Sequence, residues 1–403
     1  MGEALGRYAL VVILAFALIA SIFSTIPAGV SAQPMLINFQ IEITTSGGVN
    51  RFFTVSAGDT LVQVVNPIYS VSTSTHAMLT TRESFTGTVS GDLTGTLTEG
   101  TFNTIWVDIT QTSMRGLTVG HARYSDSHGA IDLIMILDVE AILSGGNIVG
   151  ASLKGYAFSK STTGTYASKE VFTKLEGSLT GANKWSFTGR GWIFNEAQGI
   201  SKTFDVSGSR ESAPGDIRPL NLQTGDTIVQ FKRTDITLDS SASAEFTTKQ
   251  KLTGSVTGGI TGSFTIDSNA LIITSGTHSG KGFSIARFAF EGSPDTIDGF
   301  LILDNTNFGQ HDGFIVGVSG TGIFKNKILI GEFQGTFTGP PNYYNYQGTG
   351  DVRIYSIPYL VGGEIVVVQN NKLTSGILTT LWIYGATLIV LAVVAMMIFK
   401  KRK

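Results

Sequence analysis

The chain has 403 residues, a formal net charge of −2 and only 14% charged residues. It is long enough for two or three domains, and its overall charge gives no attraction for nucleic acid or acidic partners. The absence of cysteine excludes disulfides, thiolate catalysis and cysteine-ligated zinc. An apolar content of 42% with 25 phenylalanines indicates packed cores, not disorder.

The N-terminus begins with a basic residue and a long apolar run. The run follows Arg7 and ends in small residues that include Val30 and Ala32. This pattern predicts a secretory signal peptide over residues 1–32 that is cleaved before Gln33. The alternative is an uncleaved membrane anchor, because the run approaches the roughly 20 residues that span a bilayer.

Most segments that follow alternate between apolar and polar residues and break at Gly, Asn, Asp or Ser, as short antiparallel strands do. In the first half, strands are expected near 36–44, 52–55, 60–65, 85–97, 104–109, 131–141, 152–158, 171–179 and 185–194. The stretch 85–97 alternates most strictly, and its glycines at alternate positions indicate tight curvature or the close approach of another backbone. The stretch 131–139 is apolar on both faces, which predicts a central strand covered on both sides.

The second half of the chain repeats the first. Residues 58–63 match 225–230, and 85–97 match 252–264, both at an offset of 167 (225 − 58 and 252 − 85). The matches continue at offsets of 166 and 158, after eight extra residues around 139–154 in the first copy, and end with 187–191 on 346–350. Such co-linear matches predict a duplicated domain, with copies over 33–208 and 209–362. A solenoid of short repeats is the alternative, but no constant short period runs through a copy.

The predicted fold is therefore all-β. The alternate glycines and the doubly covered central strand favour two tandem antiparallel β-barrel-like domains, with a two-sheet sandwich as the alternative architecture. Outside the two long apolar runs, no window shows the apolar period of a helix.

The C-terminus carries a second apolar run. Residues 363–376 are expected to form a last strand or stalk, and the 23 residues from Ile377 to Phe399 carry no charge and are long enough to span a bilayer. Trp382 and Tyr384 lie near the outer end, where aromatic rings favour the interface, and the basic tail 400–403 predicts a cytoplasmic C-terminus. We therefore expect a type I, single-pass protein of the cell membrane with its bulk outside.

Few residues suggest chemistry. Three pairs of aspartates recur in the two copies: Asp59/Asp226, Asp132/Asp298 and Asp138/Asp304. Asp132 and Asp138 would lie on one face of a strand but about 20 Å apart, too far for one acid–base or Ca²⁺ site, so we expect them to bond local backbone in turns. The loop residues His121, Asp126 and His128 suggest a metal site, but no histidine matches one in the other copy. No catalytic set, metal site or cofactor is predicted.

Aromatic residues give the best candidate for a binding site. Tyr343, Tyr344 and Tyr346 follow two prolines, and Trp185 and Phe187 are their expected counterparts in the first copy. Exposed aromatic platforms beside amide side chains hold sugars and other partners. The alternative is that these rings close one end of each barrel.

These features together predict a non-enzymatic envelope protein. Its expected role is structural or adhesive, with an envelope protein or a glycan as partner and no nucleic acid. The alternative is a carrier or sensor of a small apolar ligand or glycan, which requires a lined cavity inside both copies.

Overall fold

The computed structural model describes residues 34–210, 216–338, 345–357, 360–361 and 364–365. This part of the chain is nearly all β and contains three short 3₁₀ helices, η1 (Gly164–Tyr166), η2 (Glu196–Gln198) and η3 (Gly322–Phe324). It contains no helix with the length and apolar character needed to span a membrane. The expected signal peptide, the apolar run 377–399 and the basic tail lie outside the described residues.

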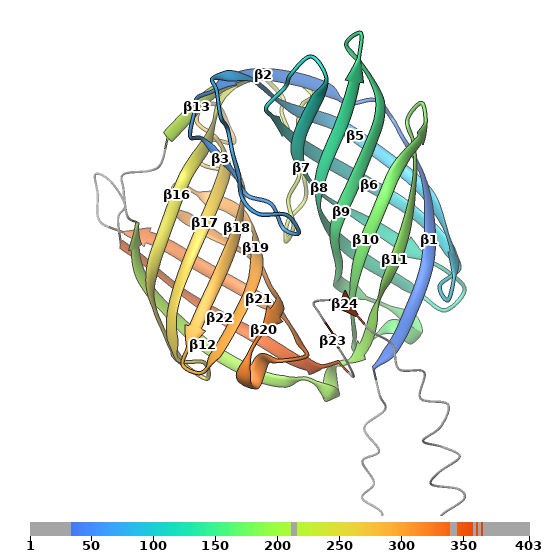
Figure 1. Ribbon diagram of the computed structural model, residues 1–403, viewed down its shortest axis with the longest axis vertical. Coiled ribbons are helices and arrows are strands. Elements are labelled where there is room, and N and C mark those ends of the chain that lie inside the picture. Colours follow the sequence, from blue (N-terminus) through green and yellow to red (C-terminus); the bar gives the residue numbers. More distant parts are fainter. Residues whose placement is uncertain (1–33, 211–215, 339–344, 358–359, 362–363, 366–403) are drawn as a thin grey trace, which may run out of the picture. The chain divides into compact units, whose positions relative to one another are not determined.

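The first copy forms a closed antiparallel sheet. Its strands are β1 (Met35–Thr45), β2 (Val49–Val55), β5 (Thr75–Gly91), β6 (Gly95–Val107), β7 (Ser113–Ser125), β8 (Ala130–Ser144), β9 (Asn147–Thr162), β10 (Lys169–Gly181) and β11 (Lys184–Asn195). They pair in the order β1-β11-β10-β9-β8-β7-β6-β5-β2. A further pairing of β1 with β5 closes all of them except β2 into a barrel (Figure 1).

The second copy repeats this arrangement. Its strands are β12 (Ile200–Arg210), β13 (Asp216–Leu222), β16 (Ala242–Gly258), β17 (Gly262–Ile273), β18 (Gly282–Gly292), β19 (Asp295–Asn307), β20 (Gln310–Gly320), β21 (Lys327–Thr338) and β22 (Asn345–Ser356). They pair in the order β12-β22-β21-β20-β19-β18-β17-β16-β13, and β12 also pairs with β16, so this sheet returns on itself as well. Two-residue strands form separate ladders: β3 (Thr60–Leu61) with β4 (Tyr69–Ser70), β14 (Thr227–Ile228) with β15 (Ile236–Thr237), and, in a second compact unit that begins at Ser356, β23 (Leu360–Val361) with β24 (Glu364–Ile365).

The change from one sheet to the other falls earlier than the expected boundary at 208/209. Strand β12 pairs only with strands of the second sheet, so the 3₁₀ helix η2, in which no residue is buried, joins the two barrels. Sequence similarity could not reveal this change, because β1 and β12 share little residue identity although they take equivalent places in their sheets.

The strictly alternating stretch 85–97 is not one strand, as expected, but the turn of a hairpin. Strand β5 ends at Gly91, β6 begins at Gly95, and Val89 pairs with Gly95. Gly91 takes a φ of +115°, which only glycine adopts without strain. The stretch 252–264 splits in the same way between β16 and β17. The period-two pattern continues through the turn, so periodicity alone could not reveal it.

The expected central strand is confirmed in β8. Met135 and Leu137 point into the barrel core, while Ile134 and Ile136 on its outer face are also fully buried. Strand β7 was missed entirely, and only the first two residues of the expected strand 60–65 are a strand.

Each barrel is filled by its own apolar cluster. The first interior leaves a void of about 30 Å³ and the second a void of about 40 Å³, both lined almost wholly by apolar side chains. Each void is about the volume of one water molecule, whereas pockets for small ligands measure roughly 300–1,000 Å³. Both barrel interiors are therefore packed.

Candidate functional site

The outer face of the second barrel carries a polar groove. Side chains alternate along β12, where Phe204 and Val206 point into the core and Asp205 points outward. The same alternation turns Gln334 on β21 and Gln347 on β22 outward, while their neighbours Phe333 and Tyr346 fill the core. Three adjacent strands thus present polar side chains on one face.

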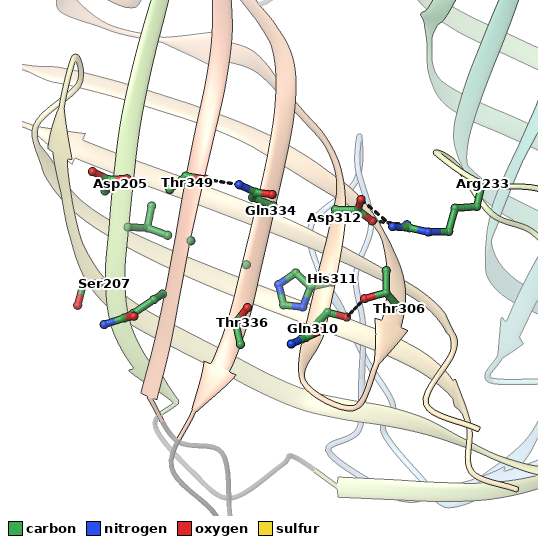
Figure 2. Close-up of a pocket in the computed structure, with 14 residues that line it drawn as sticks. Asp205, Ser207, Arg233, Thr306, Gln310, His311, Asp312, Gln334, Thr336 and Thr349 are labelled. Carbon is green, nitrogen blue, oxygen red and sulfur yellow. Dashed lines mark hydrogen bonds and ion pairs between the residues drawn. The ribbon is translucent and has the colours of Figure 1, made fainter. Parts of the chain in front are cut away.

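Figure 2 shows how these side chains surround the groove, which has a volume of about 690 Å³. Its lining comprises Asp205, Val206, Ser207, Arg233, Thr306, Gln310, His311, Asp312, Gln334, Gly335, Thr336, Gln347, Gly348 and Thr349. A second hollow of about 520 Å³ shares Asp205, Gln334 and Thr349 with it. The two hollows therefore form one elongated groove across β12, β22 and β21.

Two neighbouring loop residues, Lys232 and Arg233, form ion pairs along this groove. Arg233 donates to Asp312, with a distance of 2.9 Å from Nη2 to Oδ2. The hydrogen bond to Asp312 raises the pKa of Arg233 above its ordinary value, against the opposing effect of burial. Lys232 Nζ lies 2.6 Å from Glu332 Oε2. The backbone of this loop is held in place because Lys232 and Arg233 donate their N–H groups to the buried Asp304.

Hydrogen-bonding groups remain free in the middle of the groove. Gln334 Nε2 donates to Thr349 Oγ1 at 3.0 Å, which orients both side chains. The side chains of Asp205 and Gln347 make no hydrogen bond within the described part of the chain, and both are exposed. An amide side chain offers a donor and an acceptor at once, and a hydroxyl offers either.

A buried pair lies beneath the groove. His311 Nε2 is 2.6 Å from the Tyr346 hydroxyl, and the two rings stack with centroids 5.4 Å apart. Burial, with a smaller effect from Arg210, lowers the pKa of His311 to about 4. The imidazole is therefore neutral at pH 7 and belongs to the core that supports the groove.

The aromatic residues expected to form an exposed platform have other places. Phe187 and Tyr346 are buried in the cores of their barrels, and Trp185 packs partly buried against the first core. Tyr343 and Tyr344 lie outside the described residues. Strand pairing also changes which residues of the two copies are equivalent. Trp185 pairs with Ile43 in the first barrel, and Tyr346 pairs with Gly208 at the same place in the second. Tyr346 is therefore equivalent to Trp185 and not to Phe187.

The histidine and aspartate candidates do not converge on a site. His121 Nε2 contacts Asp235 at 2.9 Å, whereas Asp126 accepts hydrogen bonds from Tyr124 and Tyr166. Burial would raise the pKa of Asp126, but these bonds and two backbone N–H groups lower it to about 2. Within the described ranges, no group of histidines and acids has metal-binding geometry.

The other recurring acids also have structural partners. Asp59 and Asp226 bond local backbone as expected, since they accept the N–H groups of Ser56 and Gln223, whereas Asp132 and Asp138 have partners on other strands and loops. Asp138 is buried and accepts three backbone N–H bonds from residues 64–66, more than 70 positions away. Asp59 and Asp226 form ion pairs with arginines of the opposite barrel. Asp132 binds Arg123 on the adjacent strand.

The groove combines a net negative charge with many amide and hydroxyl groups. Its acids are Asp205, Asp312, Glu332 and Asp351 and its bases are Lys232 and Arg233, which gives a formal charge of −2 (two bases minus four acids). A negative groove repels phosphates and sulfates, whereas its amides and hydroxyls suit sugar hydroxyl groups. Sequence reasoning missed it because its lining comes from strands and loops that are distant along the chain. The only available signal was the polar face at 334–336 and 347–349.

Comparisons with known proteins add no argument. No protein-family model and no curated protein matches the chain. Among solved structures, a chain described as the binding domain of botulinum neurotoxin DC in complex with SialylT shares 8% identity over 79% of this chain and 78% of its own, with a TM-score of 0.09.

Proposed function

We propose that this protein is a non-enzymatic component of a cell envelope, anchored in the membrane by residues 377–399, that binds neutral glycan through the groove on its second barrel. The observation that carries the proposal is the elongated groove across β12, β22 and β21, which holds free amides, hydroxyls and two carboxylates, Asp205 and Asp351, that have no ion pair within the described residues. The anchor and the outside location derive from the apolar run and the basic tail of the sequence.

The alternative of a carrier with a ligand inside each barrel has less support. Both interiors are packed, with voids of only about 30 and 40 Å³. A drug-sized or lipid-sized ligand would have to displace core side chains such as Phe264 and Leu301, which removes buried apolar contacts. A ligand on the outer face displaces only water.

The binding test compares neutral with sulfated oligosaccharides of equal length on a glycan array, followed by calorimetry. We expect the full chain to bind neutral oligosaccharides and to bind the sulfated ones at least ten-fold more weakly, because the groove is acidic. Asp205→Ala and Gln347→Ala should each weaken binding by about ten-fold, since each removes a hydrogen bond worth about 1–1.5 kcal/mol.

The duplication supplies matched controls. Gln40 and Ser186 take the places of Asp205 and Gln347 on the first barrel, as the strand pairing shows. Gln40→Ala and Ser186→Ala should therefore leave glycan affinity unchanged. Equal losses from both sets of variants, or preferred binding of the sulfated ligands, would refute the assignment of the groove.

A further inference from the structure

The contacts between the two barrels come in exchanged pairs. Arg51 of the first barrel holds Asp226 of the second, with distances of 2.6 Å (Nε to Oδ2) and 2.7 Å (Nη2 to Oδ1). Arg218 of the second barrel holds Asp59 of the first through the same atoms at the same distances. Each arginine and each aspartate is related to its counterpart by 167 positions (218 − 51 and 226 − 59).

Hydroxyl groups reinforce both ion pairs in the same exchanged way. Thr81 donates to Asp226 at 3.0 Å, and its equivalent Thr248 donates to Asp59 at 3.0 Å. The two carboxylates are almost fully buried. A buried carboxylate needs a full set of partners, and in each case the opposite barrel supplies the arginine and this hydroxyl.

Two buried asparagines bind the loops of the opposite barrel. Asn269 accepts from the backbone N–H of Val62 at 2.6 Å and donates to the carbonyl of Thr60 at 2.8 Å. Asn103 makes the equivalent bonds to Val229 at 2.7 Å and to Thr227 at 2.9 Å. Strand β3 and the residue after it, from the first copy, are therefore hydrogen-bonded to the second barrel, and the equivalent segment at β14 is hydrogen-bonded to the first barrel.

Apolar contacts fill the surface between these polar groups. Tyr156 stacks on Phe300 with ring centroids 5.5 Å apart, and Phe158 contacts both Phe300 and Phe314. Strands β2 and β13 also lie side by side (Figure 1). The outer faces of β8 and β19, which would otherwise expose Ile134, Ile136 and Ile302, are buried.

Exchanged contacts of this kind are the mark of an isologous interface, in which residue i meets j and j meets i. Two domains joined by a linker have no reason to meet in this way unless the surface itself is self-complementary. We infer that this surface is a homodimer interface of the repeat, retained after duplication, so that its natural partner is a second copy of the same repeat and the linker η2 is not needed for association.

The two copies have diverged at several equivalent positions of this interface, such as His121 and Arg287. His121 of the first barrel contacts Asp235 of the second, whereas Arg287, its equivalent, donates to the backbone carbonyl of Asn66. Both side chains still reach the loop of the opposite barrel. At this position the contact with the opposite barrel is therefore kept although the residue types differ, as expected if the role of the surface is association.

The test cuts the full chain at the linker. A site-specific protease sequence is inserted between Ala197 and Gln198, which leaves every strand of both barrels intact. After cleavage without denaturant, the two fragments should elute together on size exclusion at the volume of the uncut protein. Separate elution of two folded fragments would overturn the inference.

Variants then test whether the exchanged contacts hold the fragments together. Asp59→Asn with Asp226→Asn should make the cleaved fragments separate, with at least a hundred-fold loss of affinity. Asp132→Asn, which removes an ion pair within the first barrel, should not separate them. If the double variant fails to fold, Asn103→Ala with Asn269→Ala replaces it. Persistent association in a folded interface variant contradicts the assignment.

Discussion

At the scale of single residues, His311 and Tyr346 distinguish the interior of the second barrel from that of the first. Their equivalents in the first barrel are Leu153 and Trp185, as the pairing of β8 with β9 and of β1 with β11 shows. The second core thus holds a hydrogen-bonded polar pair where the first holds apolar side chains. This pair lies beneath the groove of the second barrel, and His311 contributes to its lining.

His311 should make stability depend on pH. Burial lowers its pKa from 6.5 to about 4 in the folded protein, so between these values the unfolded chain binds the proton more strongly. Its contribution is complete above pH 6.5 and is lost as pH falls towards 4, by about 3 kcal/mol. His311→Leu with Tyr346→Trp, which installs the pair of the first barrel, should remove this slope in urea unfolding from pH 7 to 4.

The measurement compares variants at each pH, because other groups titrate in the same range. Burial raises the pKa values of Asp138 and Asp304, and these two groups oppose the histidine as pH falls. The control is His128→Leu, which removes a histidine whose side chain is 66% exposed and leaves His311 and Tyr346 in place. An unchanged slope in the double variant would show that His311 is not the titrating group.

At the scale of elements, period-two alternation predicted most strands correctly but did not predict where each strand ends. It placed β1, β8 and β11 within a few residues, because each has a clear core-facing series. It merged the end of β5 with the start of β6, because Leu93 in the turn continues the apolar series and is itself buried. Only the left-handed backbone at Gly91 marks the turn, and glycines elsewhere in the same series do not have it.

The loop after β3 gives a prediction at this scale. Asp138 accepts the N–H groups of Val64, Val65 and Asn66 at 2.7, 2.9 and 2.8 Å, so one buried carboxylate fixes the whole loop. Asp138→Ala should lower the free energy of unfolding by about 3 kcal/mol, because one buried and two partly buried N–H donors lose their acceptor. The matched control is Asp132→Ala on the same strand, whose half-exposed ion pair with Arg123 is worth at most about 1 kcal/mol. Equal losses in chemical denaturation would contradict this role.

At the scale of the whole molecule, the duplication was the most informative feature of the sequence. It predicted two all-β copies, because the matching glycines and apolar residues preserve backbone geometry. It did not predict the interface, since Arg51 and Asp226 are 175 positions apart and belong to different copies. Nor did it predict the groove. In the last strand of each copy, sequence similarity aligns Tyr346 with Phe187, whereas strand pairing makes Tyr346 equivalent to Trp185, two residues earlier.

The absence of cysteine makes the proposed membrane topology directly testable. Ser90 is exposed on β5, and Lys403 ends the basic tail. In intact cells, a membrane-impermeant maleimide should label a Ser90→Cys variant, because the barrels are proposed to lie outside. A Lys403→Cys variant should react only after permeabilisation, because the basic tail favours the cytoplasmic side. The unmodified chain has no thiol and gives the background. Labelling of Lys403→Cys in intact cells, or protection of Ser90→Cys, would refute an external protein held by a C-terminal anchor.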